Sequence, residues 1–138
     1  MTPWGTIMTM TIARIASAAV LLAIASPAMA ACPVGSYDAV GWNPGAPADS
    51  APGYTARVTI GERGADVCTI DWNLGRQEFS AVALFDSRTQ QLHASYANLE
   101  EGWFGIISYR LEGNRWVGEW AIYNTGNGLR GRETLTRR

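Results

Sequence analysis

The 138-residue chain contains no lysine, and all 11 of its basic side chains are arginine. Acidic and basic residues almost cancel, which leaves a formal net charge of −1. The arginines are spread along the chain, and only the last four lie close together in the sequence, at positions 130, 132, 137 and 138. Proteins that bind nucleic acid concentrate their basic side chains on one face. We therefore expect no nucleic-acid partner.

Proline is absent after Pro52. Because proline cannot donate a hydrogen bond to a strand ladder, its absence allows the rest of the chain to form a continuous sheet. Three prolines, Pro44, Pro47 and Pro52, gather with glycine, alanine and serine in residues 43–53. That composition predicts a Pro/Gly-rich loop.

Long apolar runs are also missing, apart from one near the N-terminus. Residues 15–24 are apolar, Arg14 precedes them, and Pro27 and the small residues Ala28 and Ala30 follow. This order is typical of a signal peptide, and the run is shorter than the about 20 residues that span a bilayer. We expect residues 1–30 to be removed. Residues 31–138 then form one domain, periplasmic or secreted, without a transmembrane span.

Only two cysteines are present, Cys32 and Cys68. In an exported domain, two cysteines most simply form one disulfide. The alternative is a lipoprotein anchored through Cys32, because Met29-Ala30-Ala31 approximates the small-residue run that precedes a lipid-modified cysteine. The first interpretation is favoured, since leucine is usual where Met29 stands.

Apolar and polar residues alternate with a period of two from Tyr54 onward, which predicts half-buried strands. With an opening strand, the pattern indicates about eight strands, at residues 37–42, 54–60, 68–74, 79–85, 92–96, 103–111, 116–122 and 129–136. Short strands at even spacing predict an all-β antiparallel up-and-down meander. Closure into a small barrel removes exposed edges, and a two-sheet sandwich is the alternative.

Two local features refine the predicted barrel. Val82 and Leu84 oppose the apolar face of their strand, which suggests that strand 79–85 is buried on both sides. Gly105, Gly118 and Gly131 fall on inward faces, where a missing side chain lets a strand bend around a tight barrel.

Five tryptophans follow residue 30, and they have two possible roles: core filling or the lining of a ligand cup at one barrel end. Trp42 and Trp103 adjoin loops, so they are the better cup candidates, together with Tyr109. Trp116 and Trp120 lie in the middle of a strand and are predicted to belong to the core.

Glu133 is unusual because its alternation places it on the same face as Leu129 and Leu135. A buried carboxylate needs a partner, which Arg110 or a tyrosine hydroxyl could supply. Two interpretations stay open: a structural pair at the barrel end, or a polar anchor for a ligand inside the barrel.

Catalytic patterns are missing. His93 is the single histidine and is predicted to face solvent, so no histidine-based metal site can form. The sequence contains no Gly-x-Ser-x-Gly elbow, and no cysteine adjoins a base. We therefore expect neither an enzyme, nor a metal site, nor a cofactor.

Four segments of the chain resemble sequences in a group of small exported bacterial β proteins of unestablished function, some of them labelled fibronectin-binding. They are YDAVGWNPG at 37–45, YTARVTIG at 54–61, WVGEW at 116–120 and GRETL at 131–135. These motifs consist of glycine, aromatic and turn positions, so the resemblance implies a sheet and no reaction. In shape alone, the expected layout is similar to lipocalin and avidin barrels, which favours binding without naming a ligand.

The leading functional hypothesis is an exported, non-enzymatic binding module. It would hold a small apolar or aromatic ligand in a barrel-end cup, with Trp42, Trp103, Tyr109 and Glu133 as site residues. The alternative is a protein-interaction module, an envelope enzyme inhibitor or an adhesin, that uses loop 43–53.

Overall fold

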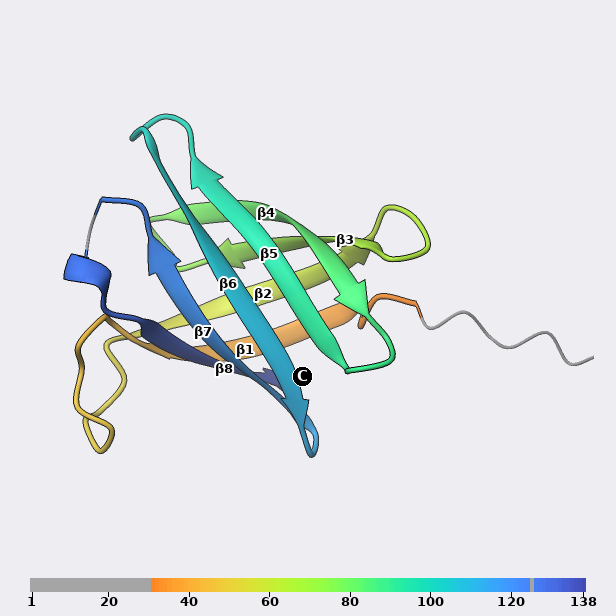
Figure 1. Ribbon diagram of the computed structural model, residues 1–138, viewed down its shortest axis with the longest axis horizontal. Helices are drawn as coiled ribbons and strands as arrows, with labels where there is room; N and C mark the ends of the chain where they lie inside the picture. Colours follow the sequence, from red (N-terminus) through yellow and green to blue (C-terminus); the bar gives the residue numbers. More distant parts are fainter. Residues whose placement is uncertain (1–30, 125) are drawn as a thin grey trace, which may run out of the picture.

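The computed structural model describes residues 31–124 and 126–138, and the predicted signal peptide lies outside them. Eight antiparallel strands, each paired with the next, form a closed barrel, because the first also pairs with the last (Figure 1). The strands are β1 (Gly35–Trp42), β2 (Tyr54–Glu62), β3 (Val67–Asn73), β4 (Glu78–Asp86), β5 (Gln91–Asn98), β6 (Trp103–Glu112), β7 (Arg115–Ile122) and β8 (Gly131–Arg137). A 3-10 turn, Gly126–Gly128, precedes β8. The predicted barrel is confirmed.

Alternation along each strand divides the side chains between a filled interior and an outer surface. On β2, for example, Ala56, Val58 and Ile60 are buried, while Thr55 and Arg57 between them are exposed. Leu92, Ile107 and Leu135 extend the same core on β5, β6 and β8. Loop 43–53 connects β1 to β2, as its composition predicts.

Two burial predictions are wrong. Val82 and Leu84 are 50% and 62% exposed, because the barrel has one interior and their strand turns its other face towards it. Leu129 is 53% exposed, since β8 begins only at Gly131 and Leu129 belongs to the preceding connection.

The two ends of the barrel differ. The β1–β2, β3–β4, β5–β6 and β7–β8 connections lie at one end, to the left in Figure 1. The N-terminal segment 31–34 lies at the opposite end, where the Tyr37 hydroxyl donates to the Pro33 carbonyl at 2.6 Å. The Arg137 guanidinium donates to the Val34 carbonyl, so β8 also holds this segment.

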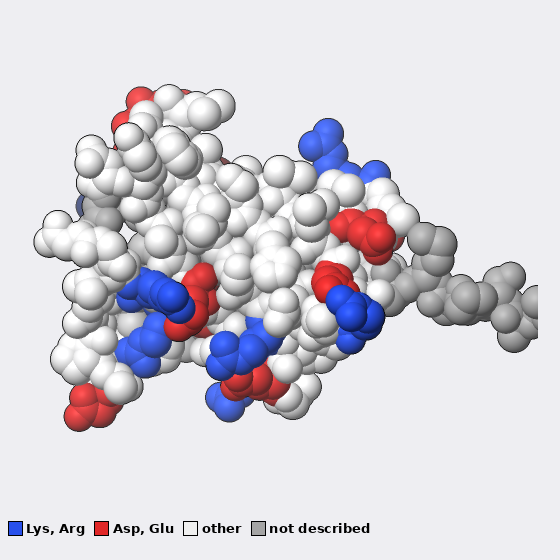
Figure 2. Space-filling view, viewed as in Figure 1, with Lys and Arg blue, Asp and Glu red and all other residues white. Residues whose placement is uncertain are grey.

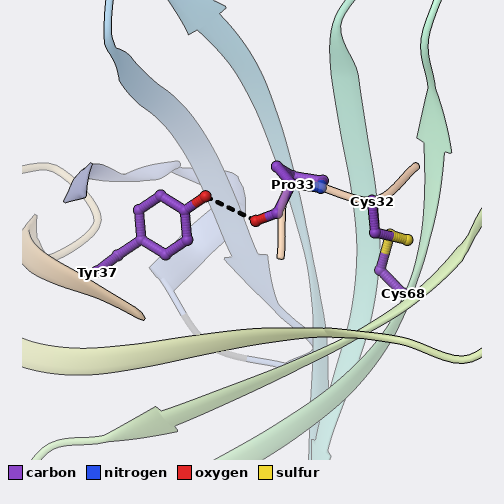
Figure 3. Close-up of a disulfide and its surroundings, with 4 residues drawn as sticks. All are labelled: Cys32, Pro33, Tyr37 and Cys68. Atoms are coloured by element: carbon purple, nitrogen blue, oxygen red, sulfur yellow. Dashed lines mark hydrogen bonds between the residues drawn. A yellow bond between two sulfur atoms is a disulfide. The ribbon is translucent and has the colours of Figure 1, made fainter. Parts of the chain in front are cut away.

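A disulfide joins Cys32 to Cys68 on β3 and fixes the N-terminal segment to the barrel (Figure 3). Both residues are buried, with 5% and 0% of their surface exposed. Because the sulfur of Cys32 is used in this bond, the predicted disulfide is confirmed and Cys32 is not available as a lipid anchor. In the part of the chain that the structure describes, no helix is long and apolar enough to cross a membrane.

We expect that replacing Cys32 and Cys68 together by alanine lowers the free energy of unfolding by about 3–4 kcal/mol. The bond closes a loop across a sequence separation of 36 residues, and the loss of that constraint raises the entropy of the unfolded chain by about this amount. Urea unfolding of the oxidised wild type and the double variant measures the difference. A loss below about 1 kcal/mol would contradict a stabilising role for the bond.

Candidate functional site: an aromatic cup at one barrel end

A cavity of about 440 Å³ opens at the barrel end opposite the disulfide. We call it the cup. Its walls are aromatic and aliphatic, formed by Tyr54, Trp72, Leu74, Phe79, Tyr96, Trp103, Ile107, Trp120 and Ile122. Its polar lining residues are Asn43, Gln77, Glu101 and Glu133. A volume of this size is typical of sites that hold one small molecule.

The aromatic rings of the cup form two groups, and within each group the rings contact one another. On the β3–β6 side, Phe79 packs against Trp103 with ring centroids 4.8 Å apart, and Tyr96 lies 6.0 Å from both Trp72 and Trp103. Tyr54 and Trp120 meet edge to face at 6.3 Å. These tilted arrangements suit the ring quadrupoles, so they fix the shape of the walls.

Glycines opposite the rings explain how large side chains fit in a narrow barrel. Four inward glycines each pair across the ladder with one aromatic residue: Gly41 with Tyr54, Gly105 with Tyr96, Gly118 with Tyr109 and Gly131 with Trp120. A Cβ on any of these glycines would lie 1.9–2.6 Å from its partner's ring atoms. Gly105, Gly118 and Gly131 were predicted to face inward and let strands bend, and the structure shows that all four glycines provide space for the rings.

Glu133 on β8 lies in the cup lining, and only 2% of its surface is exposed. The Trp72 indole donates to Oε1 at 3.0 Å, and the Tyr109 hydroxyl donates to the same oxygen. The Tyr54 hydroxyl donates to Oε2 at 2.9 Å. The carboxylate thus connects β8 with β2, β3 and β6. Of the two predicted kinds of partner, the structure shows the tyrosine hydroxyl, while Arg110 pairs with Glu112 at 2.6 Å.

Burial raises the pKa of Glu133, because desolvation outweighs the hydrogen bonds from Tyr109, Trp72 and Tyr54 that lower it. No ion pair among the described residues involves Glu133. Burial also raises the pKa values of Tyr54, Tyr96 and Tyr109, and the negative charge of Glu133 raises them further. All three hydroxyls therefore stay protonated at neutral pH.

The indole nitrogen of Trp120 is the one buried side-chain polar atom without a hydrogen-bond partner in residues 31–124 and 126–138. It lies close enough to the Tyr54 hydroxyl to lower the pKa of that group, against the larger raising effect of burial. A buried donor without a partner carries a free-energy cost of about 1–3 kcal/mol. The N–H group of Trp120 is therefore buried and unpaired next to Gly131, while the residue lines the cup.

The predicted site residues do not all meet in the cup. Trp103 and Glu133 line it, whereas Tyr109 is fully enclosed behind Glu133 as one of its donors. Trp42 lies outside, because Gly41 takes the inward position and the next residue must face outward. Its indole donates to the Ser50 carbonyl at 2.8 Å, and the Arg132 guanidinium stacks over its ring.

Sequence reasoning missed several lining residues. Tyr54, Trp72, Phe79 and Tyr96 line the cup. Alternation predicts that they face inward, but it does not assign them to one end of the barrel. Trp120 was assigned to the core and lines the cup, while Trp116 is buried at 5% exposure, as predicted. The usable signal was strand direction: in a meander, the ends of odd strands and the starts of even strands meet at the same end.

His93 faces outward, and its Nδ1 lies 2.9 Å from the Ser108 hydroxyl. Within the described ranges, no group of three or more histidine, cysteine, aspartate or glutamate side chains could hold a metal ion.

The fold and the cup together define this chain as a closed eight-stranded antiparallel barrel with a hollow at one end. No family model and no curated protein matches the sequence. Among solved structures, the chain is similar to the crystal structures of the fluorescent protein UnaG and of a mutant of it. Both comparisons have 12% identity and a TM-score of 0.47, and they cover 76% of this chain and 95–96% of the other. A likeness of this degree concerns the course of the strands alone. The resemblance to exported bacterial proteins stays a prediction.

We expect Gly131→Ala to destabilise the protein by about 1–3 kcal/mol, the usual cost of forcing extra atoms into a packed interior. The new Cβ would lie 2.0 Å from Trp120 Cε2, so the indole must move. Gly64→Ala is the matched control, since a Cβ there meets nothing within 4 Å. Urea unfolding measures stability, and near-ultraviolet circular dichroism reports the indole. Equal effects of the two substitutions would contradict the role assigned to Gly131.

We also expect Glu133→Gln to change how stability depends on pH. The pKa of Glu133 is raised above 4.5 in the folded state, so the folded protein holds this proton to higher pH than the unfolded chain does. The wild type therefore loses stability as the pH rises from about 4.5 through the folded-state pKa. Glutamine does not titrate, so the free energy of unfolding of the variant rises relative to that of the wild type across this window. Urea unfolding at pH 4–8 tests this, and a difference that falls with pH would contradict it.

Proposed function

We propose that this chain is an exported, non-enzymatic binding protein that holds one small, largely apolar or aromatic molecule in the cup. The observation that carries the proposal is an open, aromatic-walled cavity with a buried carboxylate in its lining. Apolar walls with a few convergent polar groups are the usual composition of a small-molecule site. In this arrangement the rings supply affinity and the polar groups orient the ligand.

The lining residues favour binding over catalysis. The cup is lined by asparagine, glutamine, glutamate, aromatic and aliphatic side chains, so its described lining offers no serine, cysteine, lysine or histidine as a nucleophile or base. The carboxylate of Glu133 is engaged by three neutral donors. Export is proposed from the predicted signal peptide, and the disulfide is compatible with an oxidising compartment.

A different surface supports the second candidate function, a protein-interaction module. Val82 on β4 and Ile106 on β6 both pair with Ser95 on β5. Their side chains are 50% and 62% exposed, respectively. Figure 2 shows that the middle of this face is largely uncharged. Val82 and Ile106 therefore lie on either side of Ser95 on one face, and exposed apolar side chains that gather on one face often mark an interaction surface. Loop 43–53, in contrast, is held to the barrel by Trp42 and Arg132.

We expect the neutral dye N-phenyl-1-naphthylamine to bind to the folded protein with an increase in its fluorescence, because the cup removes it from water. Trp103→Ala should weaken binding about tenfold, since one aromatic contact contributes about 0.5–1.5 kcal/mol beyond the area that it buries. Tyr123→Ala is the control, because Tyr123 is an exposed aromatic residue outside the cup lining.

Fluorescence titration of the three proteins, each shown to be folded by circular dichroism, measures these affinities. Equal weakening by Trp103→Ala and Tyr123→Ala would place the dye outside the cup. No binding to the wild type would contradict the proposed function.

A further inference from the structure

The charged residues of the cup lining are all acidic. Glu133 and Glu101 are its charged residues, and no arginine is part of it. The arginines nearest in sequence are engaged elsewhere: Arg132 donates to the Pro47 carbonyl and stacks on Trp42, and Arg130 pairs with Glu119 at 2.9 Å. Arg76, on the 74–77 connection, is exposed and lies outside the lining. An anionic ligand would therefore meet carboxylates without a compensating cation.

The carboxylate of Glu133 has unused capacity on one oxygen. Oε1 accepts two hydrogen bonds, from Trp72 and Tyr109, whereas Oε2 accepts one, from Tyr54. An ionised carboxylate offers about four acceptor positions. Oε2 therefore keeps one acceptor position, and the donors that surround the group are all neutral. A positive charge is what would compensate this buried carboxylate.

Aromatic faces add a second attraction for a cation. Trp72, Tyr96, Trp103 and Trp120 line the same cavity as Glu133. Trp and Tyr rings attract ammonium groups that lie within about 6 Å of their centroids, through the negative charge of their faces. At Trp103, Glu101 Oε2 accepts the indole N–H at 2.7 Å and adds a second negative charge to the lining.

We propose that the cup selects an organic cation: a primary amine on an aromatic or apolar body, with its ammonium group on Glu133 Oε2 and its rings between the aromatic walls. This inference rests on the proposed function and names the chemical class of its ligand. Carboxylic acids of the same shape are expected to bind more weakly, because the two carboxylates of the lining repel them.

Binding of the cation is coupled to the protonation state of Glu133. Burial raises the pKa of Glu133, and a bound ammonium group would lower it again, because it stabilises the ionised form. The titratable groups that contact this carboxylate are Tyr54 of β2 and Tyr109 of β6, and the Tyr96 hydroxyl of β5 also senses its charge. Since these hydroxyls stay protonated at neutral pH, Glu133 is the group of this cluster that titrates.

Three ligands with one body test the proposal: 2-(1-naphthyl)ethylamine, 2-(1-naphthyl)ethanol and 3-(1-naphthyl)propionate. Isothermal titration calorimetry at pH 7 should show that the amine binds at least tenfold more tightly than the alcohol, and that the acid binds most weakly. Glu133→Gln should remove the preference for the amine. Glu112→Gln removes the same charge from an exposed carboxylate outside the cup and should keep the preference.

The outcomes separate the inference from the function on which it rests. If the alcohol or the acid binds as tightly as the amine, the cup binds small molecules but the choice of a cation is wrong. If the amine keeps its advantage in Glu133→Gln, Glu133 is not the anchor and the inference is overturned. If none of the three ligands binds to the wild type, the proposed function fails as well.

Discussion

The hydrogen bonds to the carboxylate of Glu133 are the interaction on which the inside of this barrel depends. Moving an ionised carboxylate out of water has an effective cost of several kcal/mol, which hydrogen bonds must offset. Here three neutral donors from β2, β3 and β6 converge on a residue of β8. Two of the donors, Tyr54 and Trp72, are also walls of the cup. The interaction that makes the buried charge tolerable therefore also shapes the cavity.

Glycine and aromatic residues determine where that cavity can form. Each of Tyr54, Tyr96 and Trp120 faces a glycine on the adjacent strand, and a side chain at that glycine would occupy the position of the ring. The rings can therefore lie close to the barrel wall and leave space in the middle. The disulfide end is different, because residues 31–34 are fixed there and Trp116 packs against Phe85 at 6.2 Å. The glycine partners of these three rings thus lie at the end at which the cup opens.

The sequence predicted the fold better than the site. Alternation assigned the inward faces, absence of proline after Pro52 favoured a continuous sheet, and even spacing favoured a meander. Removal of exposed edges favoured closure, and the structure is a closed barrel. Alternation fails where both faces are apolar, as at Val82 and Leu84, since only closure of the barrel decides which face is inside. It also does not distinguish the two ends of a strand.

For the site, alternation placed Glu133 inside and indicated a tyrosine hydroxyl as one of its possible partners. Proximity to a loop was the weaker criterion, because Trp42 adjoins loop 43–53 and still faces outward. Trp120 was assigned to the core because it lies within a strand, yet β7 ends two residues later at the mouth of the cup. The unpaired N–H of Trp120 and the free acceptor position of Glu133 depend on distances of a few tenths of an ångström, which a residue pattern does not contain.

The most direct test is a carbon-13 NMR titration of the Glu133 side-chain carboxyl, assigned by its loss in Glu133→Gln, with and without 2-(1-naphthyl)ethylamine. A buried carboxylate without a bound cation should titrate above its ordinary pKa of 4.5 in the free protein, and the bound amine should lower that pKa. A carboxyl group that titrates at its ordinary pKa and does not respond to the amine would contradict the account.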